Sequence, residues 1–212
     1  MDLQLEPSHL SFFERNVAQK RWHYVHFHES ETELLDNICR FLQPALRPKH
    51  AGVVVATADH LAGVRERASI FGLDLHAAEA SGQFVPLNAE ELLSRIMLNG
   101  LPDHTRFHVI MQGLLQKTAE MHPYLHIYGE MVALLWQQGN EKGTHLLEEL
   151  WNNLGRMRPF SLLCGYPKSA FHSEEQANSF SRICNAHSHV HAVRFPDRSI
   201  YFAAMSTAPT RS

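Results

Sequence analysis

The sequence predicts an α/β fold with three layers, in which a largely parallel central sheet is flanked by helices. Residues 50–57 (HAGVVVAT) form a nearly continuous apolar run, which is typical of a strand buried on both faces. Strand patterns alternate with helical patterns of ten or more residues, as they do in parallel sheets with crossover helices. The 212 residues, 44% of them apolar, can bury one sizeable core, so we expect a single domain.

The strands are predicted from short runs rich in β-branched, aromatic and other apolar residues, bounded by turn residues. In chain order they are 23–28, 50–57, 83–87, 125–128 and 160–165.

The helices are predicted from apolar periodicity and from start and stop signals. In chain order they are 30–46, 59–71, 89–99, 103–121, 131–138, 141–157 and 173–187. Ser30 and Glu33 form a capping-box pattern that opens the first helix. Gly72 ends the second helix, while Gly100 and Pro102 separate the third from the fourth.

Residues 21–192 are predicted to form the domain, with extensions at 1–20 and 193–212, the latter ending in a polar and mobile tail.

The charge is nearly balanced, with 19 basic against 22 acidic residues, so we expect no direct nucleic-acid ligand. No apolar run reaches the roughly 20 residues that span a bilayer, and the first ten residues lack the pattern of a signal peptide. We therefore expect a cytoplasmic protein without membrane contact. Its three cysteines, odd in number and widely spaced, are expected to be reduced thiols.

Ligands of parallel sheets bind beyond the carboxyl ends of the strands, so the loops there are the first candidates for a site. No GxxxxGK[ST] motif occurs in the chain, which argues against tight binding or hydrolysis of a nucleoside triphosphate. Glu130 follows the strand at 125–128 directly, and Trp151 and Asn152 share a helical face. We expect Glu130, Trp151, Asn152 and His189 to line one cavity, and Glu130→Gln to preserve the fold because it conserves volume.

The chain contains 16 histidines, which raises the alternative of metal chemistry. His26 and His28 share a strand face, and His187, His189 and His191 would do so in an extended segment. No cysteine or carboxylate completes a recognised ligand spacing with them, so we expect no bound metal. A nucleophilic enzyme has less support, because no GxSxG motif occurs and Cys164 lies in an apolar strand.

Several segments together resemble one family, the MEDS sensory domain, named after methanogen and methylotroph proteins that include the DcmR regulator. The specific blocks are YGEMVALLW, ELWN and PFSLLCGYP, and the resemblance covers about residues 20–190. It implies a RecA- or KaiC-like fold that lacks the Walker A loop, a sensory role, small hydrocarbon-like or other signals, and no established catalytic residues. It also implies that residues 129–130, 149–152 and 187–189 line or support the pocket. The candidate ligand-binding residues are His26, Tyr128, Glu130, Trp151, Asn152, His187 and His189.

We therefore expect a stand-alone sensory or regulatory protein of bacterial signal transduction or transcription control, not an enzyme and without a cofactor. It would bind a small-molecule signal, act through a partner such as a kinase or a transcription factor, and form a homodimer. Two alternatives stay open: a metal-dependent enzyme that uses the histidine clusters, and a degenerate nucleotide-binding subunit that oligomerises.

Overall fold

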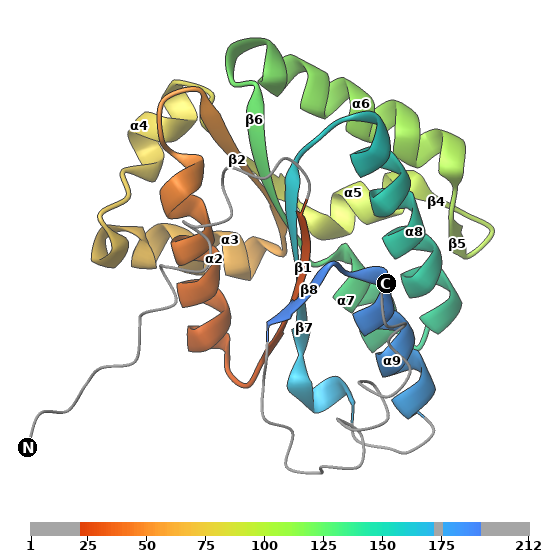
Figure 1. Cartoon of the computed structure of the whole chain (residues 1–212). Coiled ribbons are helices and arrows are strands. Elements are labelled where there is room, and N and C mark those ends of the chain that lie inside the picture. The colour runs from red at the N-terminus through yellow and green to blue at the C-terminus, as the bar shows by residue number, and fades with distance from the viewer. Residues whose placement is uncertain (1–21, 172–175, 192–212) are drawn as a thin grey trace, which may run out of the picture.

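The computed structural model describes residues 22–171 and 176–191, and its core is a six-stranded sheet in the order β3-β2-β6-β7-β1-β8 (Figure 1). All neighbouring strands in this sheet run parallel. Its strands are β1 (Trp22–His28), β2 (His50–Ala56), β3 (Phe84–Asn88), β6 (Tyr124–Gly129), β7 (Ser161–Pro167) and β8 (His189–His191). The predicted α/β architecture is confirmed.

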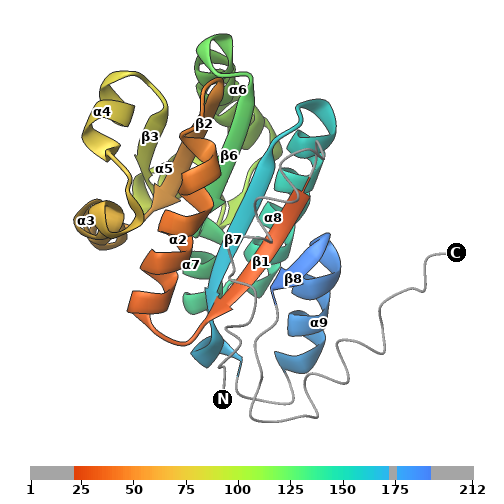
Figure 2. The same cartoon turned by 60° about the vertical axis from the view of Figure 1, so that its left-hand side comes forward.

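Helices cover both faces of the sheet and complete the three layers (Figure 2). On one face lie α2 (Glu31–Ala45), α3 (Ala58–Arg67), the 3₁₀ turn η1 (Ala68–Phe71) and α4 (Leu75–Ala80). On the other lie α5 (Ala89–Ile96), α6 (His104–Met121), α7 (Met131–Gln137), α8 (Glu141–Met157) and α9 (Ala177–Ala186), with the 3₁₀ turn η2 (Lys168–Ala170) after β7. Each face therefore has its own apolar core against the sheet.

The start and stop signals act as the sequence predicts. The Ser30 hydroxyl accepts a hydrogen bond from the Glu33 backbone N–H at 3.2 Å, and the Glu33 carboxylate accepts one from the Glu29 N–H at 2.8 Å. Gly72, with a φ of 68°, ends the segment formed by α3 and η1. These contacts satisfy backbone groups that the helix ends leave unpaired.

Three local features differ from the prediction, one of them the edge strand β8, which was not among the predicted strands. The helix predicted over 89–99 ends at Ile96, because Met97–Leu98 (β4) pairs antiparallel with Leu101–Pro102 (β5) across a turn. Asn99 and Gly100 occupy that turn with positive φ values of 52° and 80°, as a tight hairpin requires. The short helix α4 was not predicted.

The predicted extensions at 1–20 and 193–212, and the first residues of the helix predicted at 173–187, lie outside the described residues. Within the described part of the chain, no helix has both the length and the apolar character needed to cross a membrane.

Candidate functional site

Four buried side chains from distant parts of the sequence meet on the face of the sheet that α8 and α9 cover. They are His23, Glu148, Cys164 and His187, and we call them the pocket cluster. One ligand-type atom from each lies within 4.8 Å of the others. All four side chains are therefore close enough to act on one bound atom.

The local folding of each element explains this meeting. In β1, alternation points His23 to the same face as Val25 and Phe27, which lie in the core beneath α7, α8 and α9. In β7, the same alternation points Cys164 toward that core. Glu148 lies one turn before Trp151 on the buried face of α8. The polar groups of the pocket cluster thus lie on the faces of β1, β7 and α8 that otherwise carry apolar core residues.

The distances within the pocket cluster are short. His23 Nε2 lies 3.2 Å from Cys164 Sγ and 3.3 Å from Glu148 Oε2. Glu148 Oε2 lies 3.5 Å from His187 Nε2 and 3.7 Å from Cys164 Sγ. The other carboxylate oxygen accepts a hydrogen bond from the Tyr166 hydroxyl at 2.7 Å. Oε2 is therefore the point on which the other three groups converge.

Outer hydrogen bonds fix the tautomer of both imidazoles. His187 Nδ1 lies 2.6 Å from the Ile183 carbonyl oxygen, which can only accept, so Nδ1 carries the hydrogen. His23 Nδ1 lies 3.1 Å from Asn152 Oδ1, and the Asn152 amide donates to the Ala186 carbonyl at 2.9 Å. Because that donation fixes the amide orientation, His23 Nδ1 is the donor as well. Because burial keeps His187 neutral at neutral pH, its Nε2 consequently presents a lone pair to the cluster.

Burial and charge set the protonation of the cluster. Burial alone would raise the pKa of Glu148, but His187, His23 and Tyr166 outweigh it and lower that pKa to about 2. Burial lowers the pKa of His187 to about 4, and burial together with Glu148 raises the pKa of Cys164 well above its ordinary value. At neutral pH the cluster therefore holds a carboxylate, a neutral His187 imidazole and a thiol.

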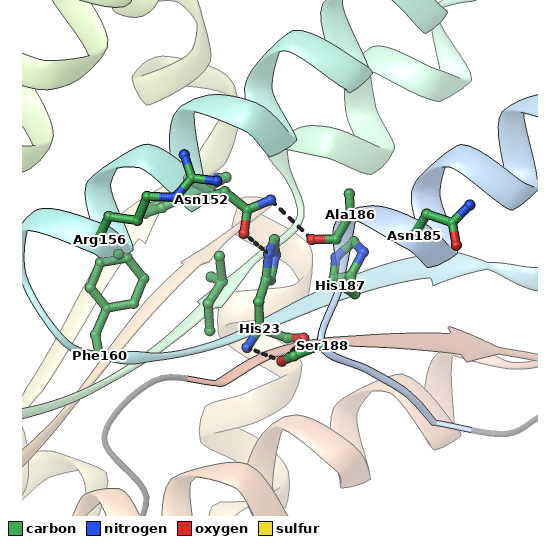
Figure 3. Close-up of a pocket in the computed structure, with 11 residues that line it drawn as sticks. His23, Asn152, Arg156, Phe160, Asn185, Ala186, His187 and Ser188 are labelled. Atoms are coloured by element: carbon green, nitrogen blue, oxygen red, sulfur yellow. Dashed lines mark hydrogen bonds between the residues drawn. The ribbon is translucent and has the colours of Figure 1, made fainter. Parts of the chain in front are cut away.

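A cavity of about 360 Å³ adjoins the cluster, between α8 and the turn from α9 into β8 (Figure 3). His23 and His187 belong to its wall. Its lining residues are His23, Trp151, Asn152, Gly155, Arg156, Phe160, Leu162, Asn185, Ala186, His187 and Ser188. The cavity combines apolar area with a few polar groups, which is the character of a small-molecule site.

A second buried carboxylate lies at the carboxyl ends of β2 and β6, and we call its surroundings the carboxyl-edge cluster: Thr57, His60, Tyr128 and Glu130. Glu130 accepts hydrogen bonds from the Thr57 backbone N–H, from the Tyr128 hydroxyl at 3.2 Å and from His60 Nδ1 at 2.8 Å. The hydrogen bond to Glu130 is the largest cause that raises the pKa of His60, although burial opposes it. Glu130 is thus saturated by donors of its own chain.

Two other predicted residues lie on the opposite face of the sheet from the cavity. His26 Nε2 lies 3.0 Å from the Asn37 amide and 3.3 Å from the Glu33 carboxylate, both on α2. His189 pairs in register with Tyr24, and their ring centroids are 5.3 Å apart. Because side chains of paired residues share a face, His189 lies on the side where Tyr24 packs against α2.

The structure therefore corrects the expectation that Glu130, Trp151, Asn152 and His189 line a single cavity. The structure brings together Trp151, Asn152 and His187, while Glu130 lies at the other end of the strands and His189 on the other face. The expectation failed because it assumed that all candidates lie at the carboxyl edge. Asn152 reaches instead toward the amino-terminal start of β1. Whether any of the predicted residues binds a ligand stays a prediction.

The cluster also resembles a nucleophile with its base. Cys164, His23 and Asn152 follow one another at 3.2 and 3.1 Å, the order of a thiol, a general base and an orienting amide. Burial and the neighbouring Glu148 oppose formation of the thiolate, however, and Cys164 is not among the residues that line the cavity. This geometry favours binding over nucleophilic chemistry.

Sequence reasoning did not assemble His23, Glu148 and Cys164 into a site. A signal was present, because Glu148 interrupts the apolar face formed by Leu147, Trp151 and Leu154. A carboxylate on a buried helical face needs a partner. The partner could not be identified without the pairing of β1 with β7.

A family model described as "MEDS: MEthanogen/methylotroph, DcmR Sensory domain" matches residues 22–182. The matched range contains three members of the pocket cluster and ends five residues before His187. Comparison with curated proteins and with solved structures gives no match.

Proposed function

The chain belongs to the MEDS family of sensory domains, and from this premise we propose that it is a regulatory protein whose small-molecule signal binds in the cavity beside the pocket cluster. The signal would act through a protein partner, such as a kinase or a transcription factor, in bacterial signal transduction or transcription control. We propose no catalytic step.

The observation that carries this proposal is the composition of the cavity wall. Phe160 and Leu162 offer apolar area, while Asn185 and Arg156 offer hydrogen-bonding groups. A volume of about 360 Å³ suits a compact molecule with one polar end. The family description, with its methanogens and methylotrophs, supports one-carbon and other short-chain compounds as the first probes.

The cavity borders the turn from α9 into β8, and this turn could transmit a conformational change to the edge of the sheet. Ser188, at the turn from α9 into β8, is tied to His23: its hydroxyl accepts from the His23 N–H and its backbone N–H donates to the His23 carbonyl, at 2.9 and 2.8 Å. A molecule in the cavity would press on this turn and shift β8, the strand at the sheet edge. A partner protein that binds at β8 would then respond to the presence of a ligand in the cavity.

We also propose that the protein forms a homodimer. β8 is an edge strand of three residues, and Val190 on it is 43% exposed. Edge strands with exposed apolar side chains are surfaces that a second chain can cover. Light scattering coupled to size exclusion should give twice the mass of 24.2 kDa, and a monomer at every concentration would contradict the dimer.

Filling the cavity tests the proposed function. Gly155 lies on α8 in the cavity wall, where a new Cβ would meet Phe160 at 3.7 Å, an ordinary contact. Gly155→Leu should therefore fold but occupy the space of the signal. Gly113→Leu is the matched control, because Gly113 also lies in a helix and a new Cβ there meets nothing within 4 Å.

The measurement is ligand-detected NMR with methanol, methylamine and short-chain alcohols and acids. We expect saturation transfer with at least one compound for the wild type and for Gly113→Leu, and none for Gly155→Leu. Equal transfer in both variants would show that the probes bind elsewhere and would contradict the proposal.

A further inference from the structure

We propose that the pocket cluster is a binding site for a transition metal ion, with Zn²⁺ as the ion that its ligands fit best. The ligands would be His23 Nε2, His187 Nε2, Glu148 Oε2 and Cys164 Sγ. Imidazole, thiolate and carboxylate are the groups that bind Zn²⁺ in proteins. This inference does not depend on the proposed sensory function.

The spacing of the ligand atoms supports a tetrahedral site. Zn²⁺ bonds of about 2.0–2.3 Å at tetrahedral angles require neighbouring ligand atoms to lie about 3.3–3.8 Å apart. The four separations around Glu148 and His23 are 3.2, 3.3, 3.5 and 3.7 Å. The other two separations, from His187 Nε2 to His23 Nε2 and to Cys164 Sγ, are at most 4.8 Å, and the His23 and His187 ring centroids are 3.9 Å apart, so binding the ion would require His187 to move relative to His23.

The orientation of the imidazoles is the stronger argument. Both Nδ1 atoms donate to carbonyl oxygens, of Ile183 and of Asn152, which is the outer-shell pattern that orients metal-binding histidines. The His187 Nε2 lone pair then faces Glu148 Oε2 at 3.5 Å, and His23 Nε2 lies 3.3 Å from the same oxygen. Within the described residues, the fully buried His187 Nε2 has no hydrogen-bond partner.

Without a cation, one acceptor of the cluster has no hydrogen facing it from the described part of the chain. The His187 Nε2 lone pair points at Glu148 Oε2, and the hydrogen of the Cys164 thiol is directed to Glu148. Lone pairs that face one another in a buried site repel, because the local dielectric is low. A cation at the centre would turn this repulsion into an attraction.

The charge balance favours a divalent ion. Glu148 is 1% exposed, and the ion-pair partners that the described residues provide for it are the two imidazoles. A divalent ion with one carboxylate and one thiolate gives a site of zero net charge, which is the least costly arrangement in an apolar interior. Tyr166, which donates to Glu148 Oε1, would hold the carboxylate in place.

The test uses the untagged protein, stripped with a chelator and then titrated with CoCl₂ as a spectroscopic substitute for Zn²⁺. We expect intense visible bands of tetrahedral Co²⁺ and a near-ultraviolet band from thiolate-to-cobalt charge transfer, saturating at one ion per chain. Stoichiometry alone would not suffice, because the surface pair His104 and His108 on α6 also stacks in a metal-binding spacing. That pair has no thiol, so the charge-transfer band distinguishes the two sites.

Cys164→Ser should abolish the charge-transfer band, and His187→Gln should weaken binding at least tenfold. Cys184→Ser and His104→Gln are the matched controls and should leave the band unchanged, with circular dichroism to verify folding of each variant. Absence of the band in the wild type would overturn the proposal without recourse to any variant. Its persistence in folded Cys164→Ser would overturn it as well. Because no small molecule is present, failure here would leave the sensory proposal untouched.

Discussion

The two buried carboxylates of this protein differ in what surrounds them. In the carboxyl-edge cluster, Glu130 faces a backbone N–H, a hydroxyl and an imidazole, all of which donate to it. In the pocket cluster, Glu148 accepts from the Tyr166 hydroxyl and the Cys164 thiol, but its Oε2 also faces the Nε2 lone pair of His187, and a cavity lies beside the cluster. A carboxylate whose neighbours all donate to it fastens elements of the fold together, whereas one that also faces an acceptor fits the proposed cation.

Glu130→Gln should give the largest effect on stability. The amide has one accepting oxygen in place of two, so at least one of the donors from Thr57, His60 and Tyr128 loses its partner in a buried site. We expect the free energy of unfolding to fall by about 2–4 kcal/mol. This replaces the expectation from volume alone that the fold would be unaffected.

Urea unfolding followed by circular dichroism measures this change. Glu66→Gln is the control, because Glu66 is exposed on α3, and it should change stability by less than about 0.5 kcal/mol. An equally small loss in Glu130→Gln would show that the carboxyl-edge cluster does not fasten the fold.

Glu148→Gln should have a much smaller effect on the metal-free protein. The amide oxygen can still accept from Tyr166, and the amide nitrogen can donate to the Nε2 lone pair of His187. We expect the chelator-treated variant to match the treated wild type to within about 1 kcal/mol. If Glu148→Gln lowered the free energy of unfolding as much as Glu130→Gln, the proposed difference between the two clusters would be wrong.

The fold could be predicted from the sequence because its signals are local. The apolar run at 50–57, the Ser30 cap and the Gly72 stop each depend on neighbours in the chain. The hairpin of β4 and β5 was missed although Asn99-Gly100 is a turn signal, since the helical pattern before it appeared to continue. Local patterns therefore predict the presence and type of helices and strands reliably, and the residues at which they end less reliably.

The site could be predicted only in part, because it depends on pairing between distant segments. Trp151 and Asn152 were chosen from their helical face, and the hydrogen bonds of Asn152 to His23 and Ala186 agree with a polar role. The partners of Glu148 come from β1 and β7, which are adjacent in the sheet though far apart in the chain. No spacing rule in the sequence joins them.

Gly155→Ala, in the wall of the cavity beside the pocket cluster, should increase the free energy of unfolding slightly. The cavity leaves room for a methyl group there, so the variant should gain about 0.5–1 kcal/mol from helix propensity. Gly113→Ala on α6 should gain a similar amount by the same mechanism. Thermal unfolding of the two variants measures both gains. A loss of stability in Gly155→Ala alone would mean that the wall of the cavity is tighter than the structure shows.

The smallest effect concerns the titration of His60. Its hydrogen bond to Glu130 raises its pKa above the ordinary value, Glu31 and Asp59 add to this, and burial opposes it. Since the folded-state pKa is raised, the stability contributed by protonated His60 is complete below the ordinary pKa of about 6.5 and is lost as the pH rises through the folded-state pKa. His28, which lies near both His60 and Glu130, has its own pKa lowered by burial and so does not share this trend.

NMR titration of the His60 ring should show a midpoint above the ordinary value in the wild type. In Glu130→Gln the midpoint should fall, because the variant removes the negative charge and with it the charge-assisted hydrogen bond that favours protonated His60. Glu148→Gln should leave it unchanged, since the pocket cluster lies on the face of the sheet that α8 covers, whereas Glu130 is bonded to Tyr128 on the opposite face. A shift of the His60 midpoint in Glu148→Gln would show that the two carboxylates are coupled through the sheet, and the contrast between a fastening cluster and a binding cluster would no longer hold.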